Sequence, residues 1–352
     1  MPSSDAPRAA LARKLKRQQA QVLDAISRFR TDIKRRPTPA RRAHAVADAQ
    51  ALKEARLAAK QLGQHARTIT HPPRKKPTVT PADKGLLSGL VQQSAAVNPD
   101  IKQPAVRYMP MAGSLWNPAT GIPGAEDVTQ GFSGDCYFLS SLAAVALCEP
   151  ATIATMIVAT PEGYRVRFHR VLLGLVLPGP PIDIAITAEL PVDAEGNLVY
   201  ARTGEGGAQW VPLMEKAFIK FEGDLRTGLS NGSYSGVLVG IEAGSPSAAL
   251  SSITGRNMPS TLASEVSNAG LARASAADRP VTLMSRLSIQ GDGGYTDPSK
   301  LIFSSHAYYL ERYDDATGKI HIRNPHGWHF GPIALDETEL HKHFLLVQGN
   351  LN

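Results

Sequence analysis

The strongest constraint on the fold is a glycine-containing turn at residues 130–134 that leads directly into an apolar run. Asp135 stands where a helix N-cap is expected, so Cys136 falls in the first turn of the predicted helix. Unpaired backbone N–H groups and the positive end of the helix dipole favour a thiolate there. Cys136 is therefore a candidate nucleophile, and the amide of Gln130 is a candidate oxyanion donor beside it. The helical spacing is set by Phe138, Leu139, Leu142, Ala143, Ala146 and Leu147.

A cysteine nucleophile needs a base, and a predicted hairpin provides one. Residues 304–324 read as two strands joined by a turn at 314–318. Folding this hairpin brings His306 close to Asn324, because residues that face each other across an antiparallel pair are near neighbours. The Asn324 amide can then accept a hydrogen bond from the imidazole while the other ring nitrogen faces Cys136. On chemical grounds these three residues form a complete Cys-His-Asn triad.

The segment around Cys136 resembles the nucleophile block of the calpain family of papain-like cysteine proteases. Residues 130–137 are similar to the family's Gln-Gly-x-x-Gly-Asp-Cys-Trp block, with Tyr137 in place of the tryptophan. Residues 210–220 are similar to a scaffold helix of the family, Trp-x-x-Leu-Leu-Glu-Lys-Ala-Tyr. The resemblance implies an α+β, papain-like core of two lobes, in which a helical lobe holds the cysteine and a β-rich lobe holds the histidine and asparagine.

The predicted hairpin carries two more blocks of the same resemblance. His306-Ala307-Tyr308 is similar to the family's Gly-His-Ala-Tyr block, except that Ser305 replaces the glycine. Residues 323–327 are similar to its Arg-Asn-Pro-Trp-Gly block, except that His326 replaces the tryptophan that shields the His–Asn hydrogen bond from water. These blocks imply that His306 is the base and Asn324 the orienting amide.

The replacement at position 326 raises two questions for the structure. Trp328, two residues further on, is an alternative shield for the His–Asn hydrogen bond. His326 is also a second imidazole next to Asn324 and so competes for the role of base. His306 is preferred, because only His306 has an orienting amide across the hairpin from it.

No cofactor is expected to be required, and calcium is the one candidate. The resemblance places Asp127 on an acidic position that the family uses for its first calcium site. The second acid, expected just before Trp210, is replaced by Gly207-Ala208-Gln209, with Glu205 nearby. Calcium takes six to eight oxygen ligands, usually with several carboxylates. Half of a site therefore predicts an enzyme that is calcium-independent or weakly calcium-dependent.

The leading hypothesis is a calpain-like cysteine endopeptidase that hydrolyses protein substrates. The resemblance suggests Gly134, in the nucleophile turn, and Gly236, at the start of a glycine-containing segment, as substrate-binding residues. Two alternatives stay open. The same triad supports acyl transfer to amines, as in a deamidase or transglutaminase, and a catalytically silent member of the fold would serve as a binding module.

The N-terminal part differs in composition from the rest of the chain. The first 86 residues hold 20 Lys and Arg against 6 Asp and Glu, whereas the remaining 266 hold 18 against 25. We expect a basic helical arm at 1–70, a proline-rich linker at 71–109 and the catalytic core at 110–352. The arm has three candidate partners: an anionic membrane surface, nucleic acid, and the acidic core itself.

Other sequence features narrow the setting. The chain has two cysteines, Cys136 and Cys148, and both fall on one predicted helix, which disfavours a disulfide. Neither belongs to a Cys-x-x-Cys zinc motif. No cleavable signal peptide or membrane-spanning run is expected. Arginine- and alanine-rich usage is typical of a bacterial source, and the expected location is cytoplasmic or exported without a cleavable signal.

Overall fold

The computed structural model describes most of the predicted core. The basic arm at 1–70, linker residues 71–97, Glu205 and Gly236 lie outside the described residues, so the predictions for them remain predictions. The described residues are 98–101, 105–171, 178–204, 206–227, 232–234, 241–242, 244–286 and 295–352.

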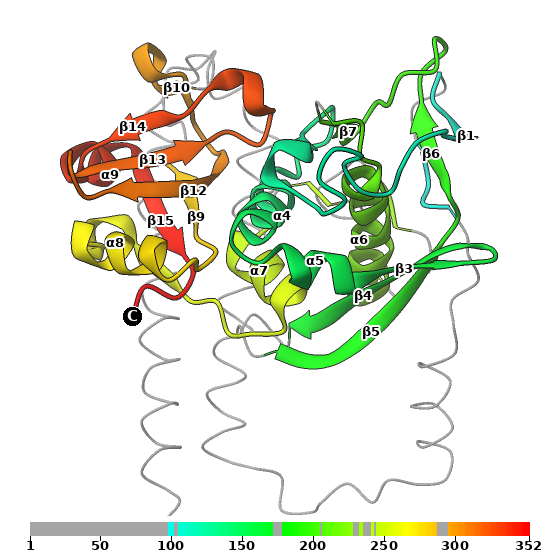
Figure 1. The fold of residues 1–352 in the computed structure, drawn as a ribbon, viewed down its shortest axis with the longest axis horizontal. Helices are drawn as coiled ribbons and strands as arrows, with labels where there is room; N and C mark the ends of the chain where they lie inside the picture. The colour runs from blue at the N-terminus through cyan, green and yellow to red at the C-terminus, as the bar shows by residue number, and fades with distance from the viewer. Residues whose placement is uncertain are drawn as a thin grey trace, which may run out of the picture. The chain divides into compact units, whose positions relative to one another are not determined.

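One half of the described core is mainly helical (Figure 1). Helix α4 packs against α5 and α7, while α6 lies against the sheet β3-β4-β5. This half contains α4 (Cys136–Cys148), α5 (Pro150–Met156), α6 (Trp210–Thr227), α7 (Pro246–Thr254), β3 (Ile157–Thr160), β4 (Gly163–Val171) and β5 (Pro178–Ile186). Helix α4 begins at Cys136, as the sequence predicts.

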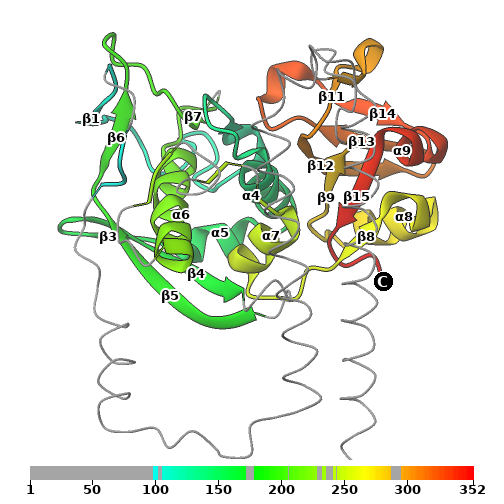
Figure 2. The same cartoon turned by 180° about the vertical axis from the view of Figure 1, so that it is seen from behind.

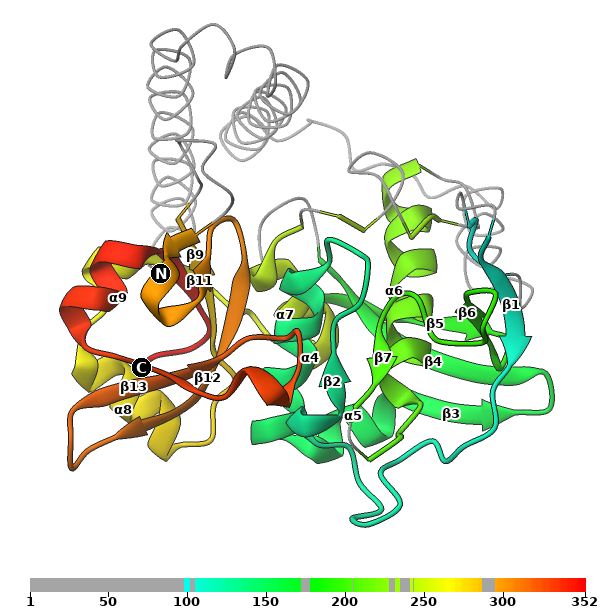
Figure 3. The same cartoon turned by 90° about the horizontal axis from the view of Figure 1, so that it is seen from above.

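Two short antiparallel pairs and a 3-10 turn complete the helical half. They are β1 (Arg107–Pro110) with β6 (Glu189–Val192), β2 (Val128–Thr129) with β7 (Arg202–Thr203), and η1 (Ala125–Asp127). Strand β2 leads into the turn before α4, and it lies beside α4 in the view from above (Figure 3).

The other half is built on an antiparallel sheet with the strand order β14-β13-β12-β9-β15-β8 (Figure 2). Helix α8 packs against β12, and α9 packs against β14 and β15. The sheet strands are β8 (Ser260–Leu262), β9 (Thr282–Ser285), β12 (Ala307–Asp314), β13 (Lys319–Arg323), β14 (Ile333–Leu335) and β15 (Phe344–Gln348). Around them lie η2 (Ala263–Glu265), α8 (Asn268–Ala276), β10 (Tyr295–Asp297), η3 (Pro298–Lys300), β11 (Ile302–Phe303), η4 (Trp328–Phe330) and α9 (Glu337–His343).

Each half has its own hydrophobic core, and strand β12 contributes to both. Tyr308 and Leu310 belong to the core of the β-rich half, whereas Ala307 and Tyr309 belong to the core of the helical half. This alternation follows from the two-residue repeat of a strand, which sends successive side chains to opposite faces. The described residues thus form the expected α+β arrangement, with β12 against α4 at the junction.

Helix α4 is buried on every side from Cys136 to Ala146. A helix that is apolar all round is usually central to its fold. Here the ring of Phe138 stacks on Phe218 of α6, with centroids 3.9 Å apart and planes at 6°. Because α4 is held on all sides, the position of its first residue is fixed by the packing of the whole helical half.

A helix that spans a membrane needs both sufficient length and an apolar composition. No single described helix is both long and apolar enough to cross a bilayer. Helices α4 and α5, bent by 117°, pass that test together on length and composition alone.

Candidate active site

Cys136 is the first residue of α4. The turn before it has no room for a side chain at position 131. A Cβ atom on Gly131 would lie 1.8 Å from the carbonyl oxygen of Tyr200, so a side chain is excluded there. Asp135 occupies the N-cap position, but its side chain makes no capping hydrogen bond. The predicted capping role of Asp135 is therefore wrong, although the helix begins where the sequence indicates.

The ionisation of Cys136 also differs from the sequence-based expectation. Its side chain is only 9% exposed. Burial raises the pKa of the thiol to about 11, and the charge of Asp135 adds to that rise. Hydrogen bonds from the backbone of Ala307, Tyr137 and Cys136 itself lower the pKa, but burial outweighs them. Desolvation thus acts against the expected thiolate and outweighs the contributions that favour it.

His306 and Asn324 meet at the open end of the β12–β13 hairpin. His306 precedes β12 and Asn324 follows β13, with Tyr309 paired to Arg323 in register. The imidazole Nε2 of His306 lies 2.9 Å from Oδ1 of Asn324. That oxygen also accepts a 3.0 Å hydrogen bond from the backbone N–H of His326, which fixes the orientation of the amide. Nε2 of His306 therefore carries the proton, and Nδ1 of the neutral ring is left as the basic nitrogen.

The backbone of His306 is fixed by Ser285 of β9. The His306 N–H donates to the Ser285 hydroxyl at 3.0 Å, and the Ser285 N–H donates to the His306 carbonyl at 2.9 Å. The preceding residue, Ser305, has a φ of +53°. This left-handed conformation favours glycine. It therefore explains why the similar Gly-His-Ala-Tyr block has glycine at the position of Ser305.

Burial keeps the His306 ring neutral. It lowers the pKa of His306 to about 4, against the opposing effect of the hydrogen bond to Asn324. The ring of His326 lowers the pKa further. Burial thus favours the uncharged form of both the candidate base and the candidate nucleophile, with the mobile proton on sulfur.

His326 takes the shielding position that the sequence leaves open. Its ring stacks on His306, with centroids 5.1 Å apart and planes at 5°, and it is held by a hydrogen bond to the backbone of Gln130. Trp328 does something else, because its ring lies 3.4 Å from the guanidinium carbon of Arg323. The contact recorded for the Trp328 ring is thus with Arg323, and that recorded over His306 is with His326. His326 does not compete for the Asn324 amide through its ring either, since its contact with Oδ1 comes from its backbone.

Gln130 links the two halves at the site. Its backbone N–H donates to the carbonyl of Pro325 at 2.8 Å. Its side-chain Nε2 donates to the carbonyl of Ser133 at 2.7 Å, which holds the amide against the turn before Cys136. An amide nitrogen has two hydrogens, so this contact leaves one for a ligand. Gly134 lies in the same turn, and a Cβ atom there would lie 3.3 Å from the side chain of Glu242.

The oxygens of Asp127 accept hydrogen bonds from three N–H donors. Asp127 is fully buried, and one of its oxygens accepts from the indole N–H of Trp210 at 2.8 Å and from the backbone N–H of Gly124 at 3.0 Å. The other oxygen accepts from the Asn117 amide at 3.3 Å. Within the described residues, no cluster of three or more His, Cys, Asp or Glu residues could hold a metal ion. The carboxylate of Asp127 joins η1 to α6. Glu205, the acid that the sequence places nearby, lies outside the described residues, so a calcium site here stays a prediction.

A cavity of about 420 Å³ borders the site. Gln130 and His326 reach it from the two halves of the core, and an exposed phenylalanine, Phe132, lies at its edge with 69% of its surface accessible. The other lining residues are Thr129, Gly131, Arg202, Phe303, His329 and Phe330. The lining is aromatic and basic and contains no acidic side chain.

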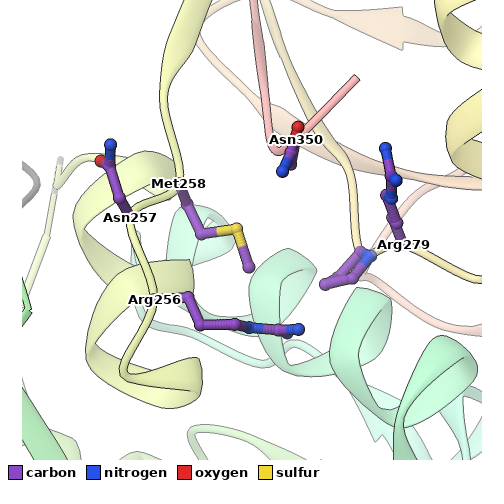
Figure 4. A pocket seen from close by; sticks show the side chains of 6 residues that line it. Arg256, Asn257, Met258, Arg279 and Asn350 are labelled. Atoms are coloured by element: carbon purple, nitrogen blue, oxygen red, sulfur yellow. The ribbon is translucent and has the colours of Figure 1, made fainter. Parts of the chain in front are cut away.

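A second, smaller cavity of about 90 Å³ contains none of the candidate site residues (Figure 4). Arg256 and Arg279 both line it, but their guanidinium groups already have partners. Arg256 pairs with Glu149, with a closest N–O distance of 2.6 Å, and Arg279 donates to the carbonyl of Asn352. The arginines therefore stabilise the fold locally.

Comparison with known proteins identifies the family. Residues 119–331, more than half of the chain, match the model of the calpain family of cysteine proteases. The fold and site are thus those of a cysteine-protease relative, and the chain belongs to the calpain family. The calpain-1 catalytic subunit of Homo sapiens is 33% identical over 127 residues, which cover 34% of this chain and 17% of that protein.

Plant relatives match over a similar stretch. The calpain-type cysteine protease ADL1 of Oryza sativa subsp. japonica is 31% identical over 130 residues, or 36% of this chain and 6% of its own length. The calpain-type cysteine protease DEK1 of Zea mays is 30% identical over 150 residues, or 39% of this chain and 6% of its own length. The chain thus matches less than a fifth of the length of these relatives.

Proposed function

We propose that this protein is a papain-like cysteine endopeptidase in which Cys136 is the nucleophile, His306 the base and Asn324 the orienting amide. The observation that carries the proposal is the hydrogen bond of 2.9 Å between His306 Nε2 and Asn324 Oδ1. This bond leaves the basic Nδ1 of His306 facing away from Asn324. The next residue, Ala307, forms a backbone hydrogen bond with the Cys136 sulfur. These two contacts support a site in which the nucleophile, the base and the amide act together.

The proposed reaction begins with both partners uncharged. As the Cys136 sulfur attacks the scissile carbonyl carbon, the thiol proton moves to Nδ1 of His306. The negative charge that develops on the carbonyl oxygen is held by the free N–H of the Gln130 amide and the backbone N–H of Cys136. When the C–N bond breaks, His306 returns the proton to the leaving amine. Water then attacks the thioester with His306 as the base, and the carboxylic acid product leaves with the sulfur protonated again.

The cavity beside His326 suits the segment of the substrate that follows the scissile bond and leaves as the amine product. His306 must give its proton to the leaving amine, so the chain on that side of the scissile bond extends past the imidazole. His326 stacks on that imidazole and also lines the cavity. An aromatic or large apolar side chain matches the lining phenylalanines. We therefore include, as part of the proposal, a preference for such a residue after the scissile bond.

Incubation of the purified wild-type protein and a Cys136→Ala variant with an unfolded protein substrate tests the activity. New peptide termini formed by the wild-type protein alone, detected by intact mass, would establish both the protease and its nucleophile. The same incubation with added calcium and with chelator tests calcium dependence, and equal rates are expected because the oxygens of Asp127 already accept hydrogen bonds from three N–H donors. Release of ammonia without new termini would instead indicate deamidation or acyl transfer.

A silent binding module is the second candidate, and the low exposure of Cys136 together with its raised pKa favours it. The two candidates differ in how Cys136 reacts compared with Cys148, whose thiol pKa is also raised, to about 12, by burial. A peptide-like electrophile that occupies the cavity should label Cys136 much faster than Cys148 if the site is active. Equal labelling, together with no cleavage of any protein tested, would support the silent module.

A further inference from the structure

Two buried carboxyl groups lie directly behind the candidate nucleophile. Asp135, immediately before Cys136, is fully buried, and Glu215 on α6 is 1% exposed. Within the described part of the chain, no residue other than Glu215 donates a hydrogen bond to either side-chain oxygen of Asp135, and the only backbone N–H that acts on the carboxyl group is its own. Its side chain instead makes a hydrogen-bonding contact with the carboxyl group of Glu215. Such a contact requires that one of the two groups carry a proton.

The surroundings of Glu215 do not supply a compensating charge. Both of its oxygens share one donor, the backbone N–H of Ala201, at 3.1 and 3.0 Å. Burial raises the pKa of Glu215 and of Asp135, and the repulsion between them raises that of Glu215 further. Two carboxylates at one buried site cannot both ionise at ordinary cost, and such a pair titrates as a unit.

Other titratable groups near the pair are acidic or neutral. Glu242 acts on Asp135 and raises its pKa. Tyr108, Tyr200 and Tyr234 also lie near Glu215, and each has its own pKa raised, with burial as the main cause and the charge of Glu215 as a further one. These groups do not offset a second negative charge, so they favour retention of the proton.

We propose that Asp135 and Glu215 share a single proton at neutral pH, and that this proton limits the negative charge next to the Cys136 sulfur. The pair is a positioning device for the nucleophile and does not touch the substrate. Its importance for catalysis rests on the proposed function, because only a sulfur that must become negative is affected by this charge. A full negative charge on Asp135 would oppose formation of the thiolate, because a neighbouring negative charge raises the pKa of the Cys136 thiol.

Two nearly isosteric substitutions shift the charge in opposite directions. In Asp135→Asn the remaining charge is confined to Glu215 on α6, which does not adjoin Cys136 in the chain, so the thiol should ionise more easily. In Glu215→Gln the charge is confined to Asp135, beside the sulfur, so the thiol should ionise less easily. A shift of one pKa unit corresponds to about a tenfold change in the thiolate fraction. We expect alkylation of Cys136 by iodoacetamide at pH 8 to become about tenfold faster in Asp135→Asn and about tenfold slower in Glu215→Gln.

The measurement is the rate of alkylation against pH, in a Cys148→Ala background so that one thiol reacts. Asp193→Asn, an acid outside the pair, is the matched control and should leave the profile unchanged. Equal shifts of the same sign in both pair variants, or no shift in either, would overturn the proposal. The assay needs no peptidase activity, so the two proposals can fail separately. Opposite shifts in a protein without peptidase activity would support the shared proton and contradict the proposed function. Unshifted profiles in an active peptidase would contradict the shared proton and support the proposed function.

Infrared spectroscopy provides a second test that does not depend on how well the variants fold. The wild-type protein at neutral pH should show the absorption of a buried, protonated carboxyl group, which disappears as the pH is raised and the pair loses its proton. Absence of that band at neutral pH would overturn the proposal.

Discussion

The hydroxyl of Ser140 donates a hydrogen bond of 2.9 Å to the backbone carbonyl of Ala307. Ser140 lies one turn after Cys136 on α4, and Ala307 follows His306 at the start of β12. Both residues are fully buried. The bond therefore joins the element that holds the candidate nucleophile to the element that holds the candidate base.

Substitution Ser140→Ala should lower both stability and activity. It leaves a buried carbonyl without its partner, which costs about 1–3 kcal/mol in the free energy of unfolding, and it loosens the approach of α4 to β12. Denaturant unfolding and kcat/KM on a peptide substrate measure the two effects. Ser141→Ala is the control, because the Ser141 hydroxyl bonds to Tyr137 within α4 and to Pro246, both in the helical half. If Ser141→Ala reduced kcat/KM as much as Ser140→Ala, the junction would not be specific.

Substitution Asn324→Ala should reduce kcat while leaving the protein folded. Without Oδ1 as acceptor, the His306 ring can turn and carry its proton on either nitrogen, so the basic Nδ1 is no longer guaranteed. General-base contributions are roughly 10²–10⁴-fold, and we expect a loss toward the lower end because the base itself remains. Steady-state kinetics measure it, with Asn350→Ala at an exposed position as the control. Unchanged kcat in Asn324→Ala would contradict the assigned role.

The pH dependence of stability should reveal His306. Its pKa is lowered from 6.5 to about 4 in the folded protein, so the unfolded chain binds this proton first as the pH falls. The stability that His306 contributes is present above pH 6.5 and is lost as the pH falls through 4. Denaturant unfolding of wild type should therefore lose on the order of 3 kcal/mol more than His306→Gln over this range. Parallel curves for the two proteins would contradict the lowered pKa.

Substitution Ser305→Gly should stabilise the protein. The φ of +53° at Ser305 costs a residue with a Cβ atom about 1–2 kcal/mol, and the greater freedom of glycine in the unfolded chain offsets part of the gain. We expect a net increase of about 0.5–1 kcal/mol in the free energy of unfolding, with kcat/KM unchanged. Ser304→Gly, one residue earlier and without a positive φ, should be neutral or destabilising. A stabilisation of the same size in both variants would argue against relief of strain at 305.

Substitutions of His326 should separate shielding from chemistry. His326→Trp keeps an aromatic ring over His306 and should retain activity, whereas His326→Ala exposes the hydrogen bond between His306 and Asn324 to water. We expect a loss of about tenfold in kcat for the alanine variant, since a net hydrogen bond is worth about 1 kcal/mol and more when it is shielded from water. Loss of activity in both variants would instead indicate that the imidazole of His326 takes part in the reaction.

Local patterns in the sequence predict several parts of the site. The start of α4 at Cys136 follows from a turn and helical spacing, and the β12–β13 hairpin follows from two apolar runs around a turn. Both signals lie within about 20 residues of chain. The contacts of Asp135 could not be read in this way, because Glu215 is 80 residues away and replaces the expected cap with a buried carboxyl contact. The raised pKa of Cys136 was missed for a similar reason, since desolvation depends on the packing of both halves.

His326 shows a third kind of limit. Its departure from the resembling block is visible in the sequence, but the sequence does not say whether the ring points toward His306 or away from it. The stacked arrangement depends on contacts with Gln130 from the other half of the core. Trp328, which the sequence offers as an alternative shield, stacks on Arg323.

Strand β12 sends alternate side chains into the two hydrophobic cores, and this links control of the site to the unfolding of the protein. Separation of the candidate base from the candidate nucleophile by a hinge motion would withdraw Ala307 and Tyr309 from the apolar interior of the helical half and expose them to water. A regulator that acts by spreading the two halves would therefore work against cooperative folding itself. A regulator that covers or uncovers the cavity beside His326 would expose neither side chain to water. Control of access to the cavity therefore requires less free energy than separation of the two halves.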